Sequence, residues 1–196
     1  MDIILASQSP RRKELLGQMG LKGFKIIAPD VDESMEENLA PAQLVEELSL
    51  RKAQAVADYV DDEEAIIIAA DTVVALDGGI LGKPADEREA FGMLSALSGN
   101  RHRVYTGVTV LRGSRSITSH EETIVTFREL DPEEIMDYIA TEEPMDKAGA
   151  YGIQGLGALL VSGIEGDYFN VMGLPVYRLG RILSAFGVDL LKLAAR

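Results

Sequence analysis

A basic segment near the start of the chain, Ser7-Gln8-Ser9-Pro10-Arg11-Arg12-Lys13, combines hydroxyl groups with three cations. Ser9 can cap a helix and Pro10 suits its first position, which places the cations in the first helical turn. Positive charge there is disfavoured by about 0.3–1 kcal/mol per residue. Serine hydroxyls, backbone amides and guanidinium groups could instead converge on an anion. The segment therefore favours an anion site over a solvated basic turn.

Two polar residues, Asp71 and Thr72, follow the apolar run Ile66–Ala70. A continuous apolar run is typical of a strand covered on both faces. We therefore expect Asp71 at the carboxyl end of a buried strand, where open α/β sheets place ligand sites. An aspartate there could act as a general base or as a metal ligand. A strand-terminal turn or a helix cap is the structural alternative, and it stays open.

The acidic pair Asp32 and Glu33 could bind a hard divalent cation together with water and substrate oxygens. The chain has no cysteine and only two histidines, so Mg²⁺ or Mn²⁺ is the metal class that its side chains favour. Acidic pairs are also common in solvated loops, which is the alternative interpretation.

A glycine-rich loop at Asp146–Gly155 could let the backbone approach a ligand closely. Its Gln154 carries amide donors and an acceptor that could read the edge of a base, although a loop glutamine is often only solvated. The segment Gly82-Lys83-Pro84 resembles the end of a phosphate-binding P-loop, but Pro84 replaces the required hydroxyl residue. A P-loop is therefore rejected, and Lys83 matters only if it faces the same cleft. Lys52, on the second expected helix, would ordinarily lie on a solvated face.

Composition limits the function classes further. The 196 residues carry a formal charge of −13, which argues against broad binding of a nucleic-acid backbone. Without cysteine, disulfides, thiolate nucleophiles and cysteine-based zinc sites are excluded. No apolar run approaches the roughly 20 residues of a membrane span, and the first residues do not read as a secretion signal. We therefore expect a cytoplasmic protein.

The elements that must position these residues alternate between helices and strands, interrupted by long hairpins. This pattern predicts an α/β fold with a mixed sheet and flanking helices, rather than a Rossmann domain, in one domain over residues 1–196 without a clean linker. Strands are expected near 3–6, 24–28, 66–70, 73–76, 80–81, 103–112, 116–127, 158–162 and 169–172. Helices are expected near 10–19, 41–58, 86–98 and 131–140 and from 175 onward, with an irregular stretch at 144–157.

Taken together, these segments resemble the Maf family of nucleotide pyrophosphatases. The matching stretches are Leu5–Leu16, Ala70–Val74, Gly82–Pro84 and Asp146–Gly155, with Gly166-Asp167-Tyr168 and Gly173-Leu174-Pro175 near the end. They occur in family order over nearly the whole chain. The resemblance implies an elongated sheet and two lobes around a cleft, as in the inosine triphosphate pyrophosphatases.

The same resemblance implies hydrolysis of a nucleoside triphosphate to the monophosphate and pyrophosphate, with Mg²⁺ or Mn²⁺ as cofactor. It makes Asp71 the proton acceptor and a metal ligand, with Asp32 or Glu33 as the second acidic ligand. Phosphate binding falls to Ser7, Arg12, Lys52 and Lys83.

Three further positions, Arg11, Thr72 and Gln154, look like the branch of the family that hydrolyses dTTP and UTP. We expect the nucleotide as partner, with neither a nucleic acid nor a membrane, while a homodimer stays open. The alternative from another class is a nucleotide-binding regulator of septum formation or cell division without essential catalysis. Asp71 favours the hydrolase, because a carboxylate beside a polyanion weakens simple binding.

Overall fold

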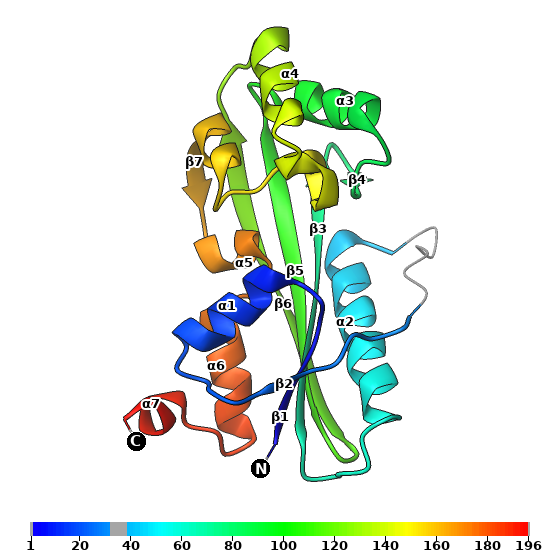
Figure 1. Cartoon of the computed structure of the whole chain (residues 1–196), viewed down its shortest axis with the longest axis vertical. Coiled ribbons are helices and arrows are strands. Elements are labelled where there is room, and N and C mark those ends of the chain that lie inside the picture. The colour runs from blue at the N-terminus through cyan, green and yellow to red at the C-terminus, as the bar shows by residue number, and fades with distance from the viewer. Residues whose placement is uncertain (1, 32–38, 196) are drawn as a thin grey trace. The chain divides into compact units, whose positions relative to one another are not determined.

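The computed structural model describes residues 2–31 and 39–195 (Figure 1). Its α-helices are α1 (Pro10–Gln18), α2 (Pro41–Ala57), α3 (Glu87–Leu97), α4 (Pro132–Ala140), α5 (Tyr168–Met172), α6 (Val176–Ala185) and α7 (Leu190–Ala194). Its strands are β1 (Ile3–Ala6), β2 (Lys25–Ile26), β3 (Ile66–Leu76), β4 (Gly79–Leu81), β5 (Arg101–Arg112), β6 (Arg115–Phe127) and β7 (Val161–Glu165). Three 3₁₀ helices, η1 (Glu143–Asp146), η2 (Ala148–Ala150) and η3 (Leu156–Leu160), fill the glycine-rich region.

The strands form one mixed sheet in the order β2-β1-β3-β5-β6-β7, with β4 paired to β3. The β1 strand runs parallel to both β2 and β3, whereas β4 and β7 pair antiparallel to β3 and β6. The structure thus confirms the predicted mixed α/β fold. Among the described residues, no helix has both the length and the apolar character to cross a bilayer.

The chain divides into two compact units. Unit 1 contains Met1–Asp71, Thr106–Glu121 and Gly173–Arg196, and unit 2 contains Thr72–Tyr105 and Glu122–Met172. Three of the four crossings between the units fall at or inside the long strands β3, β5 and β6. A conventional flexible linker therefore does not join the units at these crossings.

In unit 1, helix α2 covers the sheet face formed by alternate residues of β1 and β3 (Figure 1). Ala53 and Val56 of α2 pack in one apolar cluster with Ile67 and Ala69 of β3. The helix backbone also closely approaches β5, because a Cβ at Gly107 would overlap the backbone of Val45. These contacts fix α2 against the strands.

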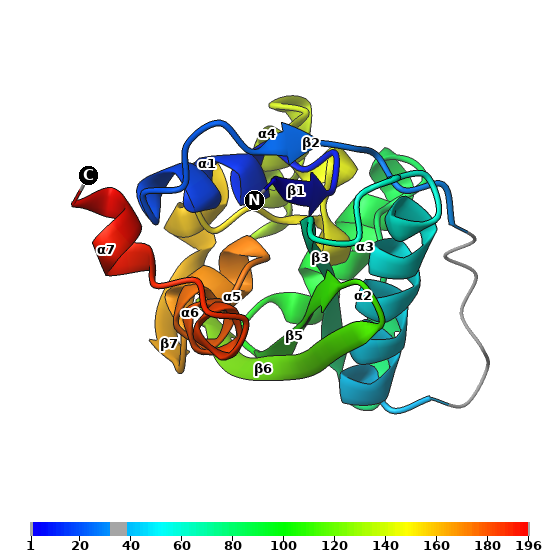
Figure 2. The ribbon, with the colours of Figure 1, turned by 90° about the horizontal axis from the view of Figure 1, so that it is seen from below.

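A polar contact also anchors α2. Ser49 Oγ lies 2.9 Å from Thr109 Oγ1 of β5, and both side chains are buried. Helix α6 contacts a different strand, since Arg178 donates to Glu121 and Ser119 of β6. Figure 2 shows the ribbons of α6 and β6. Unit 1 therefore holds its helices by polar bonds as well as by apolar packing.

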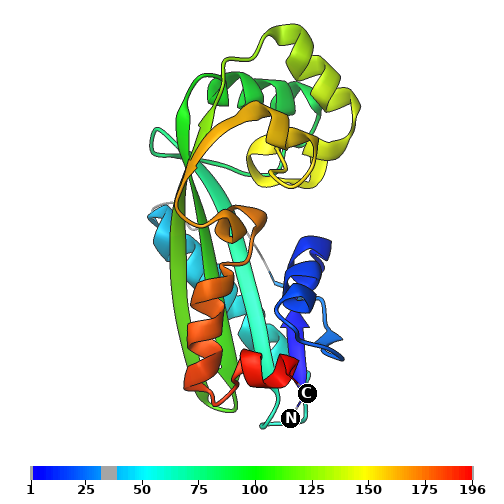
Figure 3. The same cartoon turned by 90° about the vertical axis from the view of Figure 1, so that its left-hand side faces the viewer.

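In unit 2, helices α3 and α4 lie side by side, with the 3₁₀ helices next to them (Figure 3). Asp86 caps α3 by accepting from the Glu89 amide at 2.8 Å. Asp131 and Glu134 form the reciprocal capping box of α4. These caps confirm the predicted helix starts.

Four local predictions need correction. β3 runs without interruption from Ile66 to Leu76, so Asp71 lies inside the strand and not at its carboxyl end. The segment predicted as a strand at 169–172 belongs to helix α5, since a short apolar run fits either structure. β2 has only two residues, and β7 begins three residues later than predicted.

Candidate functional site

The start of α1 forms the first part of the site. Ser9 caps the helix by accepting from the Arg12 amide at 3.4 Å, and Pro10 occupies the first turn as predicted. The buried Ser7 Oγ accepts from the Ser9 amide at 3.1 Å and from Arg12 Nη1 at 3.4 Å. Arg12 Nε also donates to the carbonyl of Gly173 at 2.7 Å. Arg12 is therefore held in place by this chain's own groups.

A buried ion pair forms the second part. Lys52 Nζ of α2 lies 2.6 Å from Asp71 Oδ1 of β3, and the two side chains are only 8% and 11% exposed. Strand alternation places Asp71 on the same face as Ile67 and Ala69, which α2 covers. Lys52 therefore does not occupy the solvated face expected of a helical lysine.

The register of the parallel strands brings the two parts to neighbouring positions. Ala6, the last residue of β1, pairs with Ala69 of β3, so Ser7 follows β1 where Ala70 and Asp71 continue β3. Strands lie about 4.8 Å apart. We refer to Ser7, Arg12, Lys52 and Asp71 as the polar cluster. Because β1 ends where β3 continues, the cluster lies at a step in the sheet.

Arg11 is half-buried in the same helical turn. Among the described residues, none forms a hydrogen bond or ion pair with the Arg11 side chain. It thus differs from Arg12, although the sequence places both in one basic turn.

Three further predicted residues, Thr72, Lys83 and Gln154, lie in unit 2. Thr72 is half-buried in β3, while Lys83 and Gln154 are exposed. The Gly149 amide donates to the Gly82 carbonyl at 3.0 Å, which ties the glycine-rich region to the residue before Lys83. A Cβ at Gly149 would lie 2.9 Å from Val74. The glycine-rich region thus packs directly on the β3–β4 hairpin.

Two residues that organise this region, Glu143 and Tyr138, were not predicted from the sequence. Burial acts to raise the pKa of Glu143, but the amides of Gly157 and Leu156, the Tyr138 hydroxyl and the charge of Lys147 together lower it. Burial raises the pKa of Tyr138, which keeps its hydroxyl protonated. The glycines at 152, 155 and 157 are the signal that could have located them, because a close neighbour leaves no room for a Cβ at these positions.

A buried aromatic group was also missed. His102 Nε2 lies 2.8 Å from the Tyr151 hydroxyl, and both rings pack edge-on against Phe127. Burial lowers the pKa of His102 to about 4. Within the described part of the chain, His102 Nδ1 has no hydrogen-bond partner. The ring is therefore neutral at physiological pH and supports the core of unit 2.

Of the predicted metal ligands, the structure describes Asp71. Asp32 and Glu33 lie outside the described residues. Within residues 2–31 and 39–195, no three acidic or histidine side chains gather as a metal site. The donor chemistry still fits a hard cation, because Asp71 supplies carboxylate oxygen and Mg²⁺ needs only one or two carboxylates beside substrate phosphates.

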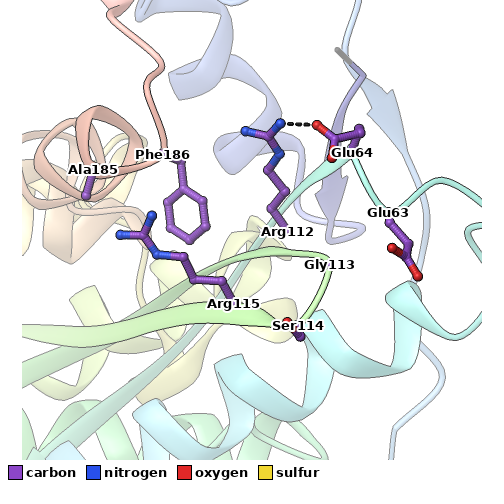
Figure 4. A pocket seen from close by; sticks show the side chains of 8 residues that line it. All are labelled: Glu63, Glu64, Arg112, Gly113, Ser114, Arg115, Ala185 and Phe186. Atoms are coloured by element: carbon purple, nitrogen blue, oxygen red, sulfur yellow. Dashed lines mark hydrogen bonds and ion pairs between the residues drawn. The ribbon is translucent and has the colours of Figure 1, made fainter.

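A separate hollow lies at the tip of the β5–β6 hairpin (Figure 4). Its two arginines are already engaged, Arg112 with Glu64 and Arg115 over the ring of Phe186 at 4.7 Å. None of the predicted site residues lines it. We assign no function to this hollow.

Known proteins are similar to this chain over most of its length. The family model described as "Maf: Maf-like protein" matches residues 2–186. A relative from Symbiobacterium thermophilum named "dTTP/UTP pyrophosphatase" is 53% identical over 185 residues, which cover 94% of each chain. A relative of the same name from Moorella thermoacetica is 54% identical over 190 residues, covering 95% of this chain and 96% of its own.

A solved structure supports the architecture. The structure of a HAM1 protein from Coxiella burnetii superposes with a TM-score of 0.54 at 16% identity, covering 94% of this chain and 99% of that one. At this level of identity the likeness concerns the fold alone. It agrees with the predicted mixed sheet with flanking helices.

Proposed function

Since the chain belongs to the Maf family, we propose that it is a nucleoside triphosphate pyrophosphatase that hydrolyses dTTP and UTP. The relatives from Symbiobacterium and Moorella carry this activity in their names, at 53% and 54% identity over nearly their whole length. The single structural observation that carries the proposal is the buried Lys52–Asp71 pair, whose Asp71 lies on the strand that pairs with β1, the strand leading into Ser7 and Arg12. The proposal therefore assigns to one reaction a carboxylate and two cations that lie on β3, on α2 and at the start of α1.

The cations of the site are proposed to bind the triphosphate. A guanidinium group and an ammonium group stabilise phosphate oxygens by charge-assisted hydrogen bonds. In unit 1 this role falls to Arg12 and Lys52, with the Ser7 hydroxyl beside them. In unit 2 it falls to the exposed Lys83. Phosphoryl transfer depends mostly on such positioning and charge stabilisation, so a histidine base is not required.

Asp71 is proposed to accept the proton of the attacking water. Water adds to a phosphorus of the α–β anhydride, the bond to the bridging oxygen breaks, and nucleoside monophosphate and pyrophosphate leave. Asp71, with Asp32 or Glu33, would also hold Mg²⁺ or Mn²⁺. When bound, the cation would neutralise charge on the phosphate oxygens.

Base selection is proposed to rest on Arg11, Thr72 and Gln154. The Gln154 amide can offer a donor and an acceptor to the O4 and N3–H edge that uracil and thymine share. One additional methyl group changes binding by only about 1–3 kcal/mol, so one site can accept both bases. Such a site would remove particular nucleotides from the cytoplasmic pool, and a homodimer would be compatible with it.

The proposal is tested by measuring pyrophosphate release from dTTP, UTP, CTP, GTP and 7-methyl-GTP with Mg²⁺ or Mn²⁺. We expect the highest kcat/KM for dTTP and UTP, with the monophosphate as the other product. Preference for a purine nucleotide would contradict the base assignment. Tight nucleotide binding without any pyrophosphate release would favour the regulatory alternative.

A further inference from the structure

We propose that Glu143 and Tyr138 are positioning residues that hold Gln154 for base recognition by fixing the loop Gly152–Gly157, here named the Gln154 loop. The proposal rests on the proposed function, because it takes Gln154 as the base reader. In this proposal the two residues do not contact the nucleotide. They fix the backbone from which the Gln154 side chain extends.

The carboxylate of Glu143 binds the chain just after Gln154. Its Oε2 accepts from the Leu156 amide at 2.9 Å, and its Oε1 accepts from the Gly157 amide at 2.9 Å. Hydrogen bonds to an ionised acceptor contribute more to stability than neutral ones. Glu143 thus acts as an internal anion that accepts hydrogen bonds from two backbone amides of the Gln154 loop.

Tyr138 binds the chain just before Gln154. Its hydroxyl oxygen accepts from the Gly152 amide at 3.1 Å, and its proton is donated to Glu143 Oε1 at 2.8 Å. Tyr138 is buried at the end of α4, whereas Gln154 is exposed. The two side chains therefore anchor the loop on both sides of an exposed glutamine.

The glycines of the loop are explained by this internal contact. A Cβ at Gly155 would overlap the Glu143 carboxylate, and one at Gly157 would lie 2.6 Å from both the Tyr138 hydroxyl and the Gly152 carbonyl. At Gly152 it would lie 2.8 Å from Lys147 Cε. From the sequence, these glycines were expected to let the backbone approach a ligand closely. In the structure, the glycines at 152, 155 and 157 permit a close approach to the protein's own groups.

A glutamine at position 143 cannot replace the glutamate. All three groups around the carboxylate are donors, namely the Leu156 and Gly157 amides and the Tyr138 hydroxyl. An amide side chain has one acceptor oxygen, and its nitrogen would face a donor. Glu143→Gln keeps the size of the side chain but leaves one acceptor oxygen for three donors. The substitution therefore tests the role of the carboxylate without a change in volume.

The experiment compares Glu143→Gln with the control Glu142→Gln, which makes the same charge change at the exposed neighbouring residue. kcat/KM is measured for dTTP and CTP, together with hydrogen exchange at the Leu156 and Gly157 amides. We expect Glu143→Gln to speed exchange at both amides and to lower the dTTP-to-CTP ratio of kcat/KM about tenfold, mainly through KM. Glu142→Gln should change neither quantity.

Tyr138→Phe provides a milder variant that retains the buried ring. Because it removes a neutral hydroxyl, we expect the ratio to fall by about two- to fivefold. This variant keeps the proposal testable if Glu143→Gln does not fold.

Gln154→Glu separates the two levels of the hypothesis. If Gln154→Glu shifts the base preference while Glu143→Gln and Tyr138→Phe leave it unchanged, the positioning role is overturned and the base reader stands. Faster amide exchange with an unchanged ratio has the same meaning. If Gln154→Glu itself leaves the preference unchanged, the base reader fails and the positioning role fails with it.

Discussion

The polar cluster of unit 1 and the Gln154 loop of unit 2 each contain a carboxylate, but its partners differ in charge. In the cluster, the carboxylate of Asp71 faces a lysine, and the pair is almost completely buried. In the loop, the carboxylate of Glu143 faces backbone amides and a tyrosine hydroxyl. The first arrangement joins side chains from different elements, whereas the second shapes one short stretch of backbone.

This difference indicates a division of roles within the proposed hydrolase. A charged pair set on a strand and a helix can serve a reaction at phosphate, which is common to all nucleotides. A loop fixed through its own amides can present one side chain in a defined place. Changes in the polar cluster should therefore affect all nucleotides alike, while changes in the loop should affect base preference.

The largest effect is expected for Asp71→Asn. Removing the proton acceptor should lower kcat by about 100- to 10,000-fold, equally for dTTP and CTP. The substitution also leaves Lys52 without its counter-charge, and breaking a buried pair costs about 3–5 kcal/mol of unfolding free energy. Pyrophosphate release and urea unfolding measure the two consequences separately.

The double variant Asp71→Asn/Lys52→Met is the matched control for that loss. It removes both charges, so it should recover stability relative to Asp71→Asn but no activity. A stable double variant with restored hydrolysis would show that Asp71 only neutralises Lys52.

The next effect concerns the stability of unit 2 at acid pH. Burial lowers the pKa of His102 from 6.5 to about 4. The unfolded chain then binds a proton that the folded chain does not, so stability is complete above pH 6.5 and is lost as the pH falls toward 4. The loss is about 3 kcal/mol by linkage. It is measured as the unfolding free energy at pH 7 and pH 4.

His102→Gln is the matched variant, because it cannot titrate but can still bond to the Tyr151 hydroxyl. The carboxylates are common to both proteins, so the difference between their pH profiles isolates the histidine. Parallel profiles for wild type and variant would show that folding does not lower the pKa of His102.

A third prediction concerns Gly157. An added Cβ would meet backbone and the Tyr138 hydroxyl at 2.6 Å, so Gly157→Ala should lower the unfolding free energy by about 1–3 kcal/mol. Gly92 of α3 has no atom within 4 Å of such a Cβ, and Gly92→Ala should raise stability by about 0.5–1 kcal/mol. Thermal unfolding of both variants checks the prediction. Equal effects at the two positions would contradict the close packing of the Gln154 loop.

The smallest effect distinguishes Arg12 from Arg11. Arg12→Ala loses the bond to the Gly173 carbonyl and should lower stability by about 1 kcal/mol. Arg11→Ala removes a cation from a helix N-terminus and should leave stability unchanged or raise it by a few tenths of a kcal/mol. Thermal unfolding without nucleotide compares them, and a larger loss for Arg11→Ala would reverse the assignment.

Much of the fold could be predicted from local pattern. The Pro41 start of α2, the Asp131 capping box and the hairpin turn at Gly113-Ser114 follow from residues close in sequence. The continuity of β3 could not be predicted in this way. Asp71 and Thr72 interrupt the apolar run, and only pairing with neighbouring strands shows that the strand continues.

The site was predictable where its chemistry was unusual for its position. Cations in the first turn of α1 drew attention because the helix dipole disfavours them. Lys52 gave no such signal, since its partner Asp71 lies 19 residues away and the burial of both depends on tertiary packing. Glu143 is one of 32 acidic residues, so its residue type alone does not single it out. Its role depends on hydrogen bonds from backbone amides, which every residue type except proline can supply.

The most direct test of this division of roles is the ratio of kcat/KM for dTTP to kcat/KM for CTP, measured in wild type, Arg12→Ala and Gln154→Glu. We predict that Arg12→Ala lowers both values and leaves the ratio within about twofold of wild type, because the phosphates are common to both substrates. Gln154→Glu should lower the ratio by about tenfold or more, since a carboxylate suits the amino group of cytosine. A changed ratio in Arg12→Ala together with an unchanged ratio in Gln154→Glu would contradict the account.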